Sequence, residues 1–254
     1  MFAEPSFVVY RIAAMAQGVP FTAVPLNHYV HDLEAMARAV HARTRLVFIA
    51  NPNNPTGTYV GRDSLRSFLN KLPDEVIAVI DEAYLEYAVA ADYPDALQCL
   101  SSHARTIVLR TFSKAYGLAG LRLGYAVAPA ELAPHLNAVR APFNANSVAQ
   151  AAALVALDDT EHLERVRQLN RSEMERVQHA LESYPSITVV PSEANFLLLQ
   201  LDQPAAEVYG RLLRLGVIVR PIPPLPTALR VSIGLPAEND RFLAALREVL
   251  RERS

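Results

Sequence analysis

The sequence is poor in the residues that build disulfide frameworks and metal clusters. Cys99 is the only cysteine, so no disulfide bond and no cluster of thiolate ligands can form within one chain. The seven histidines are dispersed, and His28 and His31, which could share a helix face, have no nearby third ligand. We therefore expect no metal site and interpret this histidine pair as solvated side chains.

Long apolar runs and one-sided charge are also missing. No stretch reaches the roughly 18 apolar residues of a membrane span, and the start shows no charged-then-apolar leader. The net charge is −2, with acidic residues balancing scattered arginines, which argues against a nucleic-acid-binding surface. We expect a cytoplasmic protein with neither a membrane nor a nucleic-acid partner.

Lysine is nearly absent. Of the 24 basic residues only Lys71 and Lys114 are lysines, and the other 22 are arginines. Arginine can replace the charge of lysine but not its chemistry, because a lysine amine can lose its proton and attack a carbonyl carbon. Lys114 is therefore a candidate nucleophile, unless it is a surface lysine that escaped the bias towards arginine.

Three short apolar runs, residues 45–50, 75–80 and 106–109, predict strands that are buried on both faces. Residues 63–71 and 95–102, which lie between them, have the pattern of helices. Strands that alternate with helices indicate an α/β fold with a mostly parallel sheet.

Polar side chains lie just beyond each of these strands. Asn54 follows the first, Asp81 follows the second, and Lys114 follows the third. Because parallel strands end at the same edge of a sheet, we expect an amide, a carboxylate and an amine to converge there. The alternatives are turn chemistry for Asn54 and a helix N-cap for Asp81.

Pyridoxal 5′-phosphate, held as a Schiff base of a lysine, would use all three groups. The cofactor needs an amine for its aldehyde, a carboxylate for its ring nitrogen and hydrogen-bond donors for its phenolate oxygen. Lys114 would supply the amine and Asp81 the carboxylate, while Asn54 and Tyr84 would donate to the phenolate.

The cofactor phosphate needs donors of its own. Thr111, Ser113 and Arg122 flank Lys114 and could bind it, and glycines in this segment allow the backbone to approach closely. A Walker-type phosphate loop is absent, which argues against a nucleotide kinase or ATPase.

These segments resemble the histidinol-phosphate aminotransferase branch of the fold-type I, pyridoxal-phosphate-dependent aminotransferases. The matching segments occur in the family's order along almost the whole chain: residues 4–7, 51–57, 81–84, 110–124, 142–146, 191–196 and 229–234. The most specific are Thr-Phe-Ser-Lys-Ala at residues 111–115 and Asn-Pro-Asn-Asn-Pro-Thr-Gly at residues 51–57.

The resemblance implies roles that spacing alone cannot give. Lys114 would form the Schiff base and then carry the proton between the substrate and the cofactor, and Phe7 would stack on the cofactor ring. Arg230 would bind the substrate carboxylate, Arg220 the phosphate of histidinol phosphate, and Asn195 would line the carboxylate site. The alternatives are a core aromatic for Phe7 and an edge-strand arginine for Arg230.

The resemblance also implies an architecture. We expect a three-layer αβα large domain over residues 1–160, which binds the cofactor, and a smaller α+β domain over residues 161–254. A helical pattern over residues 147–157 continues through residue 183. Further strands are predicted at residues 187–190, 196–201 and 229–233, with helices at residues 205–215 and 238–251. A homodimer is expected, with amino-acid and 2-oxo-acid substrates.

Two departures from the family pattern stand out. Family members are typically longer at the amino end, where a Gly-Ala-containing loop binds the cofactor phosphate and an arm reaches across the dimer. We therefore expect an incomplete phosphate site. The connection between Arg220 and Arg230 is also short and rich in proline, which is expected to change the placement of these two arginines.

The leading functional hypothesis is amino transfer between histidinol phosphate and 2-oxoglutarate, a step of histidine biosynthesis. Three alternatives remain open: an aromatic amino-acid aminotransferase acting on phenylalanine or tyrosine, a decarboxylase similar to those of phosphothreonine, and a truncated, non-catalytic remnant.

Overall fold

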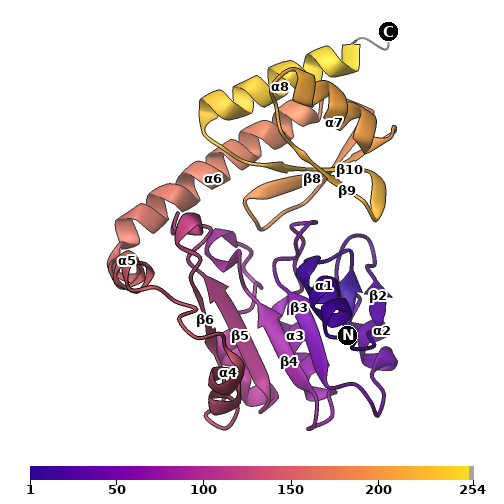
Figure 1. Ribbon diagram of the computed structural model, residues 1–254. Coiled ribbons are helices and arrows are strands. Elements are labelled where there is room, and N and C mark those ends of the chain that lie inside the picture. The colour runs from indigo at the N-terminus through magenta and orange to yellow at the C-terminus, as the bar shows by residue number, and fades with distance from the viewer. Residues whose placement is uncertain (252–254) are drawn as a thin grey trace.

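The computed structural model describes residues 1–251 and places them around two β-sheets (Figure 1). The first sheet has the strand order β2-β1-β3-β4-β5-β6, in which every neighbouring pair is parallel except β5 with β6. Its strands are β1 (Phe2–Glu4), β2 (Ala23–Pro25), β3 (Leu46–Ala50), β4 (Ile77–Asp81), β5 (Thr106–Thr111) and β6 (Gly124–Val127).

The three predicted strands are confirmed as β3, β4 and β5, each within two residues of the expected bounds. Their register aligns Ala50 with Asp81 and Asp81 with Leu109, so the three strands end side by side. The α/β fold with a mostly parallel sheet is confirmed in this part of the chain. The short strands β1, β2 and β6 were not predicted.

Helices α2 (Leu33–Ala39) and α3 (Arg62–Asn70) cover one face of this sheet. Leu65, Phe68 and Leu69 recur at helical spacing along α3 and are almost completely buried. The helix predicted at residues 63–71 is therefore confirmed. The stretch at residues 95–102 is instead the 3₁₀-helix η2 (Ala96–Ser102). The side chain of Asp95 caps it by accepting a hydrogen bond from the nitrogen of Leu97.

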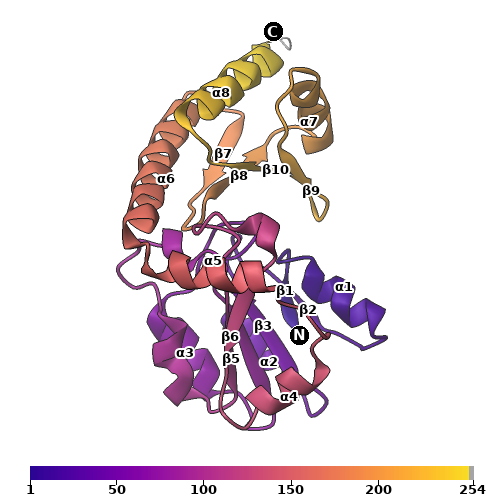
Figure 2. The same ribbon diagram turned by 60° about the vertical axis from the view of Figure 1, so that its left-hand side comes forward.

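The helices on the opposite face of the sheet bury fewer of their residues. Helices α1 (Val9–Ala16), α4 (Ala133–Val139) and α5 (Ser147–Asp158) lie on this side, and Figure 2 shows α4 and α5 in front of the sheet. Only Tyr10 of α1, and Ala149 and Ala153 of α5, are buried, while α4 buries none of its residues. This helical layer is therefore thin.

A 3₁₀-turn η1 (Leu85–Tyr87) and the long helix α6 (Thr160–Leu181) lead towards the second sheet. The helical pattern predicted from residue 147 to residue 183 was wrong in one respect, because α5 and α6 are separate helices. Asp159 lies between them, and its carboxylate accepts a hydrogen bond from the nitrogen of His162, which caps α6.

The second sheet is antiparallel throughout, with the order β7-β8-β10-β9. Its strands are β7 (Ile187–Val190), β8 (Phe196–Leu201), β9 (Arg220–Ile222) and β10 (Leu225–Ser232). Helices α6, α7 (Ala205–Arg214) and α8 (Pro236–Arg251) pack on its outer face (Figure 1). The strands and helices predicted here are confirmed, whereas β9 was not predicted.

The inner face of the second sheet contacts the first part of the chain. The guanidinium of Arg230 on β10 donates to the side-chain oxygen of Asn54 over 2.6 Å, and the hydroxyl of Tyr29 donates to Gln200 over 3.0 Å. These contacts hold the second sheet over the carboxyl edge of the first.

His28 and His31 do not share a helix face: the exposed His28 lies in a tight turn, where it and Tyr29 have positive φ angles, and His31 follows this turn. The interpretation of both as solvated was wrong for His31, which is 4% exposed and whose Nε2 lies 3.0 Å from the carbonyl oxygen of Ala50.

A buried ion pair stabilises the end of β5. The guanidinium of Arg110 contacts Glu82 at 2.8 Å and Asp95 at 3.0 Å, and the side chain of Glu82 is only 1% exposed. Because a carboxylate at such a site depends on its counter-charge, Arg110 is an anchor of the fold and not a group of the cavity described below.

We predict that Arg110→Gln lowers the free energy of unfolding by about 3 kcal/mol, because it leaves the buried carboxylate of Glu82 without its partner. Urea unfolding measures this change. Arg105→Gln is the matched control, since Arg105 pairs with Glu131 on the surface over 3.7 Å and should change stability by less than about 1 kcal/mol. The double change Arg110→Gln and Glu82→Gln should recover part of the loss, and failure to do so would contradict this assignment.

Glu86 is a partly buried residue with one buried carboxyl oxygen, on η1 where this turn contacts α6. Its Oε2 has no hydrogen-bond partner among residues 1–251, and burial raises the pKa of the Glu86 carboxyl to about 7. A raised carboxyl pKa means that the folded state binds the proton more tightly than the unfolded state. Glu86 therefore stabilises the fold at pH values below about 4.5, and this contribution is lost as the pH rises to about 7.

We predict that Glu86→Gln raises the free energy of unfolding at pH 8 by roughly 1–3 kcal/mol and changes it little at pH 5. Denaturant midpoints at the two pH values measure the effect. The control Glu175→Gln replaces an exposed carboxyl of α6 and should shift stability by no more than about 0.5 kcal/mol at either pH. An equal effect of Glu86→Gln at both pH values would show that burial of the charge is not the cause.

Candidate active site

A cavity of about 160 Å³ lies at the carboxyl edge of the first sheet, beneath the second sheet. Most of the site residues predicted from the sequence line it, although they come from segments far apart in the chain. Its lining consists of Phe7, Ala50, Pro52, Asn54, Asp81, Ala83, Tyr84, Lys114, Arg220 and Arg230. The predicted convergence of an amide, a carboxylate and an amine is therefore present.

Asp81 ends β4 and places a largely buried carboxylate at the base of this cavity. Its Oδ2 accepts a hydrogen bond from the hydroxyl of Tyr10 over 2.8 Å, and its Oδ1 accepts one from the nitrogen of Ala83 over 3.1 Å. Burial raises the pKa of the Asp81 carboxyl, and these two donors together with the charge of Lys114 oppose that rise. Asp81 caps no helix, since η1 begins only at Leu85.

Tyr10 is a residue of this candidate site that the sequence analysis missed. It is 7% exposed and stacks on Phe48 with ring centroids 4.8 Å apart. Burial and the neighbouring Asp81 raise the pKa of the Tyr10 hydroxyl well above its usual value, so the hydroxyl stays a donor. The available signal was its position three residues after Phe7, a spacing at which the two rings meet edge-on at the start of α1.

Lys114 lies after β5 with its amine directed towards the ring of Tyr84. The Nζ atom is 5.2 Å from the centroid of this ring, a cation–π contact. Tyr84 is 5% exposed and packs edge-on against Phe196 of β8, which fixes its ring. The lysine amine therefore faces a cavity that also contains the carboxylate of Asp81.

Arg230 brings a cation from the second sheet to this cavity. Its Nη1 donates to Oδ1 of Asn54 over 2.6 Å, and its guanidinium lies over the ring of Phe196 at 4.8 Å. The Nε atom is buried and has no hydrogen-bond partner within the described part of the chain. Since a buried guanidinium N–H without a partner is unfavourable, this group is available to an anionic ligand.

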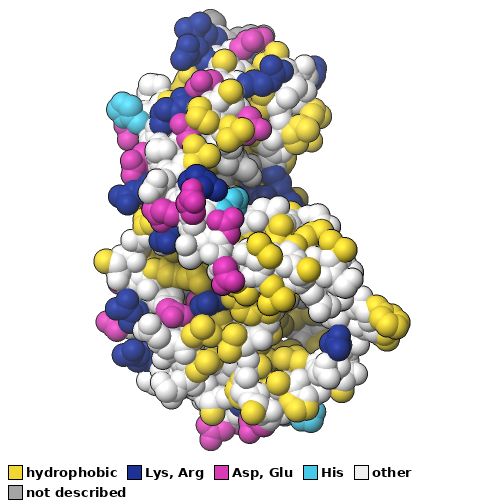
Figure 3. All heavy atoms as spheres, turned by 90° about the vertical axis from the view of Figure 1, so that its left-hand side faces the viewer, with side chains coloured by type: hydrophobic (Ala, Val, Ile, Leu, Met, Phe, Trp, Pro, Cys, Tyr) yellow, Lys and Arg dark blue, Asp and Glu magenta, His cyan; other side chains and the backbone are white. Residues whose placement is uncertain are grey.

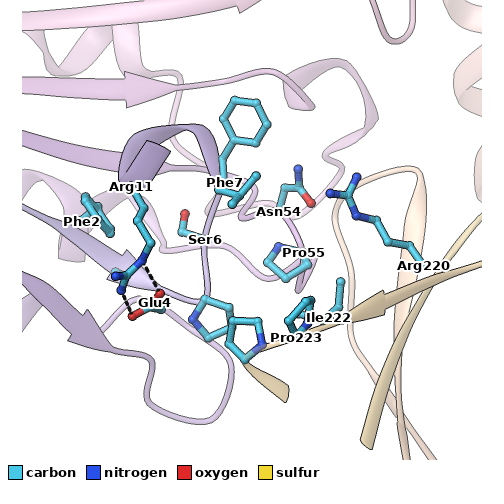
Figure 4. Close-up of a pocket in the computed structure, with 14 residues that line it drawn as sticks. Phe2, Glu4, Ser6, Phe7, Arg11, Asn54, Pro55, Arg220, Ile222 and Pro223 are labelled. Carbon is cyan, nitrogen blue, oxygen red and sulfur yellow. Dashed lines mark hydrogen bonds and ion pairs between the residues drawn. The ribbon is translucent and has the colours of Figure 1, made fainter. Parts of the chain in front are cut away.

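Arg220 lies directly opposite Arg230 in the antiparallel pair of β9 and β10. In the short, proline-rich connection between them only Pro223 and Pro224 form the turn of the hairpin, since the other residues belong to β9 and β10. Both arginines line the cavity. A neighbouring pocket of about 290 Å³ shares Phe7, Asn54 and Arg220 with it, and Figure 4 shows Arg220 pointing towards Asn54 and Phe7 from the opposite wall.

Four predicted residues do not line the cavity. Thr111, Ser113 and Arg122 belong to the segment around Lys114, where the nitrogen of Ser113 donates to the hydroxyl of Thr111 and Arg122 donates to the carbonyl of Ala119. Asn195 lies just before β8, and its carbonyl accepts a hydrogen bond from the nitrogen of Ile233, just after β10. The predicted phosphate donors are therefore grouped in the chain but not gathered around this cavity.

A pyridoxal ring fits the groups at this cavity. The carboxylate of Asp81 is buried and lacks a hydrogen bond from a cation, which is what a protonated ring nitrogen would supply. The amine of Lys114 suits an aldehyde, and Asn54, whose oxygen is taken by Arg230, has its NH₂ left to donate. Thus the ring end of the cofactor fits, while the residues predicted for its phosphate end lie outside the cavity lining.

The described residues provide no candidate metal centre and no membrane span. No group of three or more His, Cys, Asp or Glu side chains within residues 1–251 is arranged to hold a metal ion. No helix in this range is both long and apolar enough to cross a membrane.

Comparison with known proteins yields a family and close relatives. A family model described as "Aminotransferase class I and II" matches residues 1–246. The histidinol-phosphate aminotransferase 2 of Pseudomonas fluorescens is 51% identical over 252 residues, which are 98% of this chain and 68% of that protein. The histidinol-phosphate aminotransferase of Caldicellulosiruptor saccharolyticus is 44% identical over 98% of this chain and 70% of its own length.

A solved structure shares the fold. The crystal structure of histidinol-phosphate aminotransferase from Sinorhizobium meliloti, in complex with pyridoxal-5′-phosphate, matches with a TM-score of 0.92 and 30% identity. The match covers 100% of this chain and 70% of that one. By sequence, by fold and by the groups gathered around Lys114, the chain belongs to the class I and II aminotransferases, which are pyridoxal-phosphate-dependent transaminases.

Proposed function

We propose that this chain transfers an amino group between histidinol phosphate and 2-oxoglutarate, a step of histidine biosynthesis. The observation that carries the proposal is the pair Arg220 and Arg230, which lie opposite each other on β9 and β10 and line the cavity of Lys114. Two adjacent guanidinium groups suit a phosphorylated or dicarboxylate substrate. Relatives that are 43–51% identical to this chain are named histidinol-phosphate aminotransferases.

When bound, pyridoxal phosphate supplies an electron sink for negative charge at the substrate carbon that carries the amine. The residues of this chain would hold and serve it. Lys114 would bind the aldehyde and then carry the proton at the substrate Cα, as a general base must. Asp81, held by Tyr10 and Ala83, would keep the proton on the ring nitrogen.

The remaining lining residues would orient the ring and the substrate. Asn54 and Tyr84 would donate to the phenolate oxygen. Phe7, which is 37% exposed and meets Tyr10 edge-on, leaves a face free to stack on the ring. Arg230 would bind the substrate carboxylate and Arg220 the substrate phosphate, with Asn195 as a neighbour in the second sheet. Thr111, Ser113 and Arg122 stay proposed ligands of the cofactor phosphate.

We also propose a homodimer that acts in the cytoplasm. The exposed apolar side chains of α1, namely Val9, Ile12 and Met15, support a contact with a second copy. Light scattering on the purified chain would give the mass that decides between a monomer and a dimer.

The other hypotheses differ in their products. Half-reactions with phenylalanine or tyrosine would identify an aromatic amino-acid aminotransferase, and release of carbon dioxide from phosphothreonine would identify a decarboxylase. A purified chain that stays colourless in excess cofactor would support the truncated, non-catalytic remnant.

We predict that Lys114→Ala abolishes the visible absorption band of the bound cofactor, expected at roughly 410–430 nm, because the band depends on the bond to the lysine amine. Spectra recorded with excess cofactor test this. Lys71→Ala is the matched control, since Lys71 is the only other lysine and pairs with Glu34 on the surface. Equal loss of the band in both variants would contradict the role of Lys114.

We predict that Arg220→Met lowers kcat/KM for histidinol phosphate by roughly 10- to 100-fold, the effect of losing charge-assisted hydrogen bonds to a phosphate. The half-reaction with glutamate should fall less, because glutamate has no phosphate. Stopped-flow measurement of both half-reactions separates the two effects. Arg214→Met, an exposed change on α7, is the control. A uniform loss with both donors would assign Arg220 to the cofactor site instead.

A further inference from the structure

The segment between β7 and β8, residues 191–195, meets the first part of the chain near the cavity of Lys114. Within it the hydroxyl of Ser192 donates to the carbonyl of Phe196 over 2.6 Å and accepts a hydrogen bond from the nitrogen of Ala194 over 3.1 Å. These two bonds close the segment on itself. Glu193 lies between them and directs both its nitrogen and its carboxylate at other parts of the chain.

The nitrogen of Glu193 binds the loop that carries Asn54. It donates to the carbonyl of Gly57 over 2.8 Å, and the nitrogen of Gly57 donates to the carbonyl of Asn53 over 2.7 Å, which closes the loop around Asn54. The two segments approach closely, because Gly57 has a φ angle of +75° and a Cβ atom there would collide with the side chain of Ser192. Glu193 therefore helps to fix this loop relative to β8.

The carboxylate of Glu193 binds the segment that follows Tyr84. Its Oε2 accepts hydrogen bonds from the nitrogens of Val89 and Ala90 over 2.6 and 3.1 Å, although these residues lie 104 and 103 positions away in the sequence. Hydrogen bonds to a carboxylate are stronger than those between neutral groups. Since η1 connects Tyr84 to this pair of amides, the carboxylate anchors the far end of the segment that begins with Tyr84.

Three segments that each contribute to the cavity thus meet at Glu193. One carries Asn54 and another begins with Tyr84. The third continues into Phe196, whose ring lies 5.1 Å from the ring of Tyr84 and 4.8 Å from the guanidinium of Arg230. A change in the position of Glu193 would therefore reach cavity residues from both sheets.

The outer connection between the two parts is formed by α6. Figure 3 views the molecule from this side and shows charged side chains spread over the region where the two parts meet. The pair of Glu161 and Arg165 at the start of α6 is exposed, and ion pairs of this kind contribute little to stability. The position of the second sheet over the cavity then depends on contacts between the two parts, such as those of Glu193.

We propose that Glu193 is a positioning residue of the transaminase reaction. It holds Asn54, Tyr84 and, through Phe196, Arg230 where they bind the cofactor and the substrate, so the inference rests on the roles proposed above for these residues. Glu193 does not itself line the cavity and acts through the others. A residue that supported only its own loop would leave the binding of cofactor and substrate unchanged.

Hydrogen–deuterium exchange on the purified chain, without any ligand, tests the first step of the proposal. In Glu193→Ala we expect the amides of Val89 and Ala90 to lose protection, and we expect the loss to extend to Gly57 and to the amides of η1. A loss confined to Val89 and Ala90 would show a local support and overturn the proposal. This measurement does not depend on which substrate the chain uses.

Binding measurements test the second step. Titration with pyridoxal 5′-phosphate, followed by its visible band, should give a dissociation constant that is roughly 5- to 10-fold higher in Glu193→Ala, because misplaced groups bind less well. The KM for glutamate should rise about tenfold with a smaller change in kcat, since Arg230 is displaced. Unchanged cofactor binding would overturn the proposal. Failure to turn over histidinol phosphate would count against the proposed function, while the cofactor titration would still decide the role of Glu193.

Two further variants separate positioning from general destabilisation. Glu193→Gln keeps an oxygen that accepts the same two bonds, so its cofactor affinity should stay within about threefold of the unchanged chain. Glu238→Ala is the matched control, since the Oε2 of Glu238 accepts a hydrogen bond from the nitrogen of Leu235 over 2.7 Å at the start of α8, away from the cavity. Equal losses in Glu193→Ala and Glu238→Ala, or in Glu193→Ala and Glu193→Gln, would overturn the proposal.

Discussion

The buried carboxylate of Asp81 is the charge on which the arrangement of the site depends. It ends β4 in the middle of the first sheet, where it has lost most of its contact with water. Two donors from this chain, the hydroxyl of Tyr10 and the nitrogen of Ala83, are directed at it. They offset only part of the cost of burial, since the pKa of Asp81 stays raised. A cationic ring placed against this carboxylate would offset more of it, which links cofactor binding to the stability of the sheet edge.

The second constraint is the hydrogen bond between Arg230 and Asn54. It joins the second sheet to the loop after β3. Because both residues line the cavity, the bond fixes the lining from the second sheet relative to the lining from the first. It also determines what Asn54 can do, because an oxygen that accepts from Arg230 leaves only the NH₂ group for a ligand. Arg230 also stacks on Phe196, and Phe196 contacts the ring of Tyr84. Because the amine of Lys114 lies over that ring, these contacts link the second sheet to the position of Lys114 as well.

The sequence predicted the core strands and the residues at their ends because these depend on local patterns. Apolar runs such as residues 106–109 mark buried strands, and polar residues directly after parallel strands must meet at one edge. It missed Tyr10, whose role depends on a contact across 71 positions with Asp81 that no spacing rule encodes. It also joined α5 to α6, because the helical pattern runs on through Asp159, and only the cap formed by that side chain separates the two helices.

The predicted phosphate ligands lie on the side of the first sheet formed by β5 and β6. Thr111 ends β5, and Arg122 lies just before β6, the strand whose outer edge is unpaired. The hydroxyl of Thr111 accepts a hydrogen bond from the backbone nitrogen of Ser113, and the guanidinium of Arg122 donates to the carbonyl of Ala119. A phosphate that came within hydrogen-bond distance could compete with these local partners. The groups gathered around Lys114 thus come from both sheets of this chain, whereas the predicted phosphate ligands lie outside the cavity lining and near the outer strand β6.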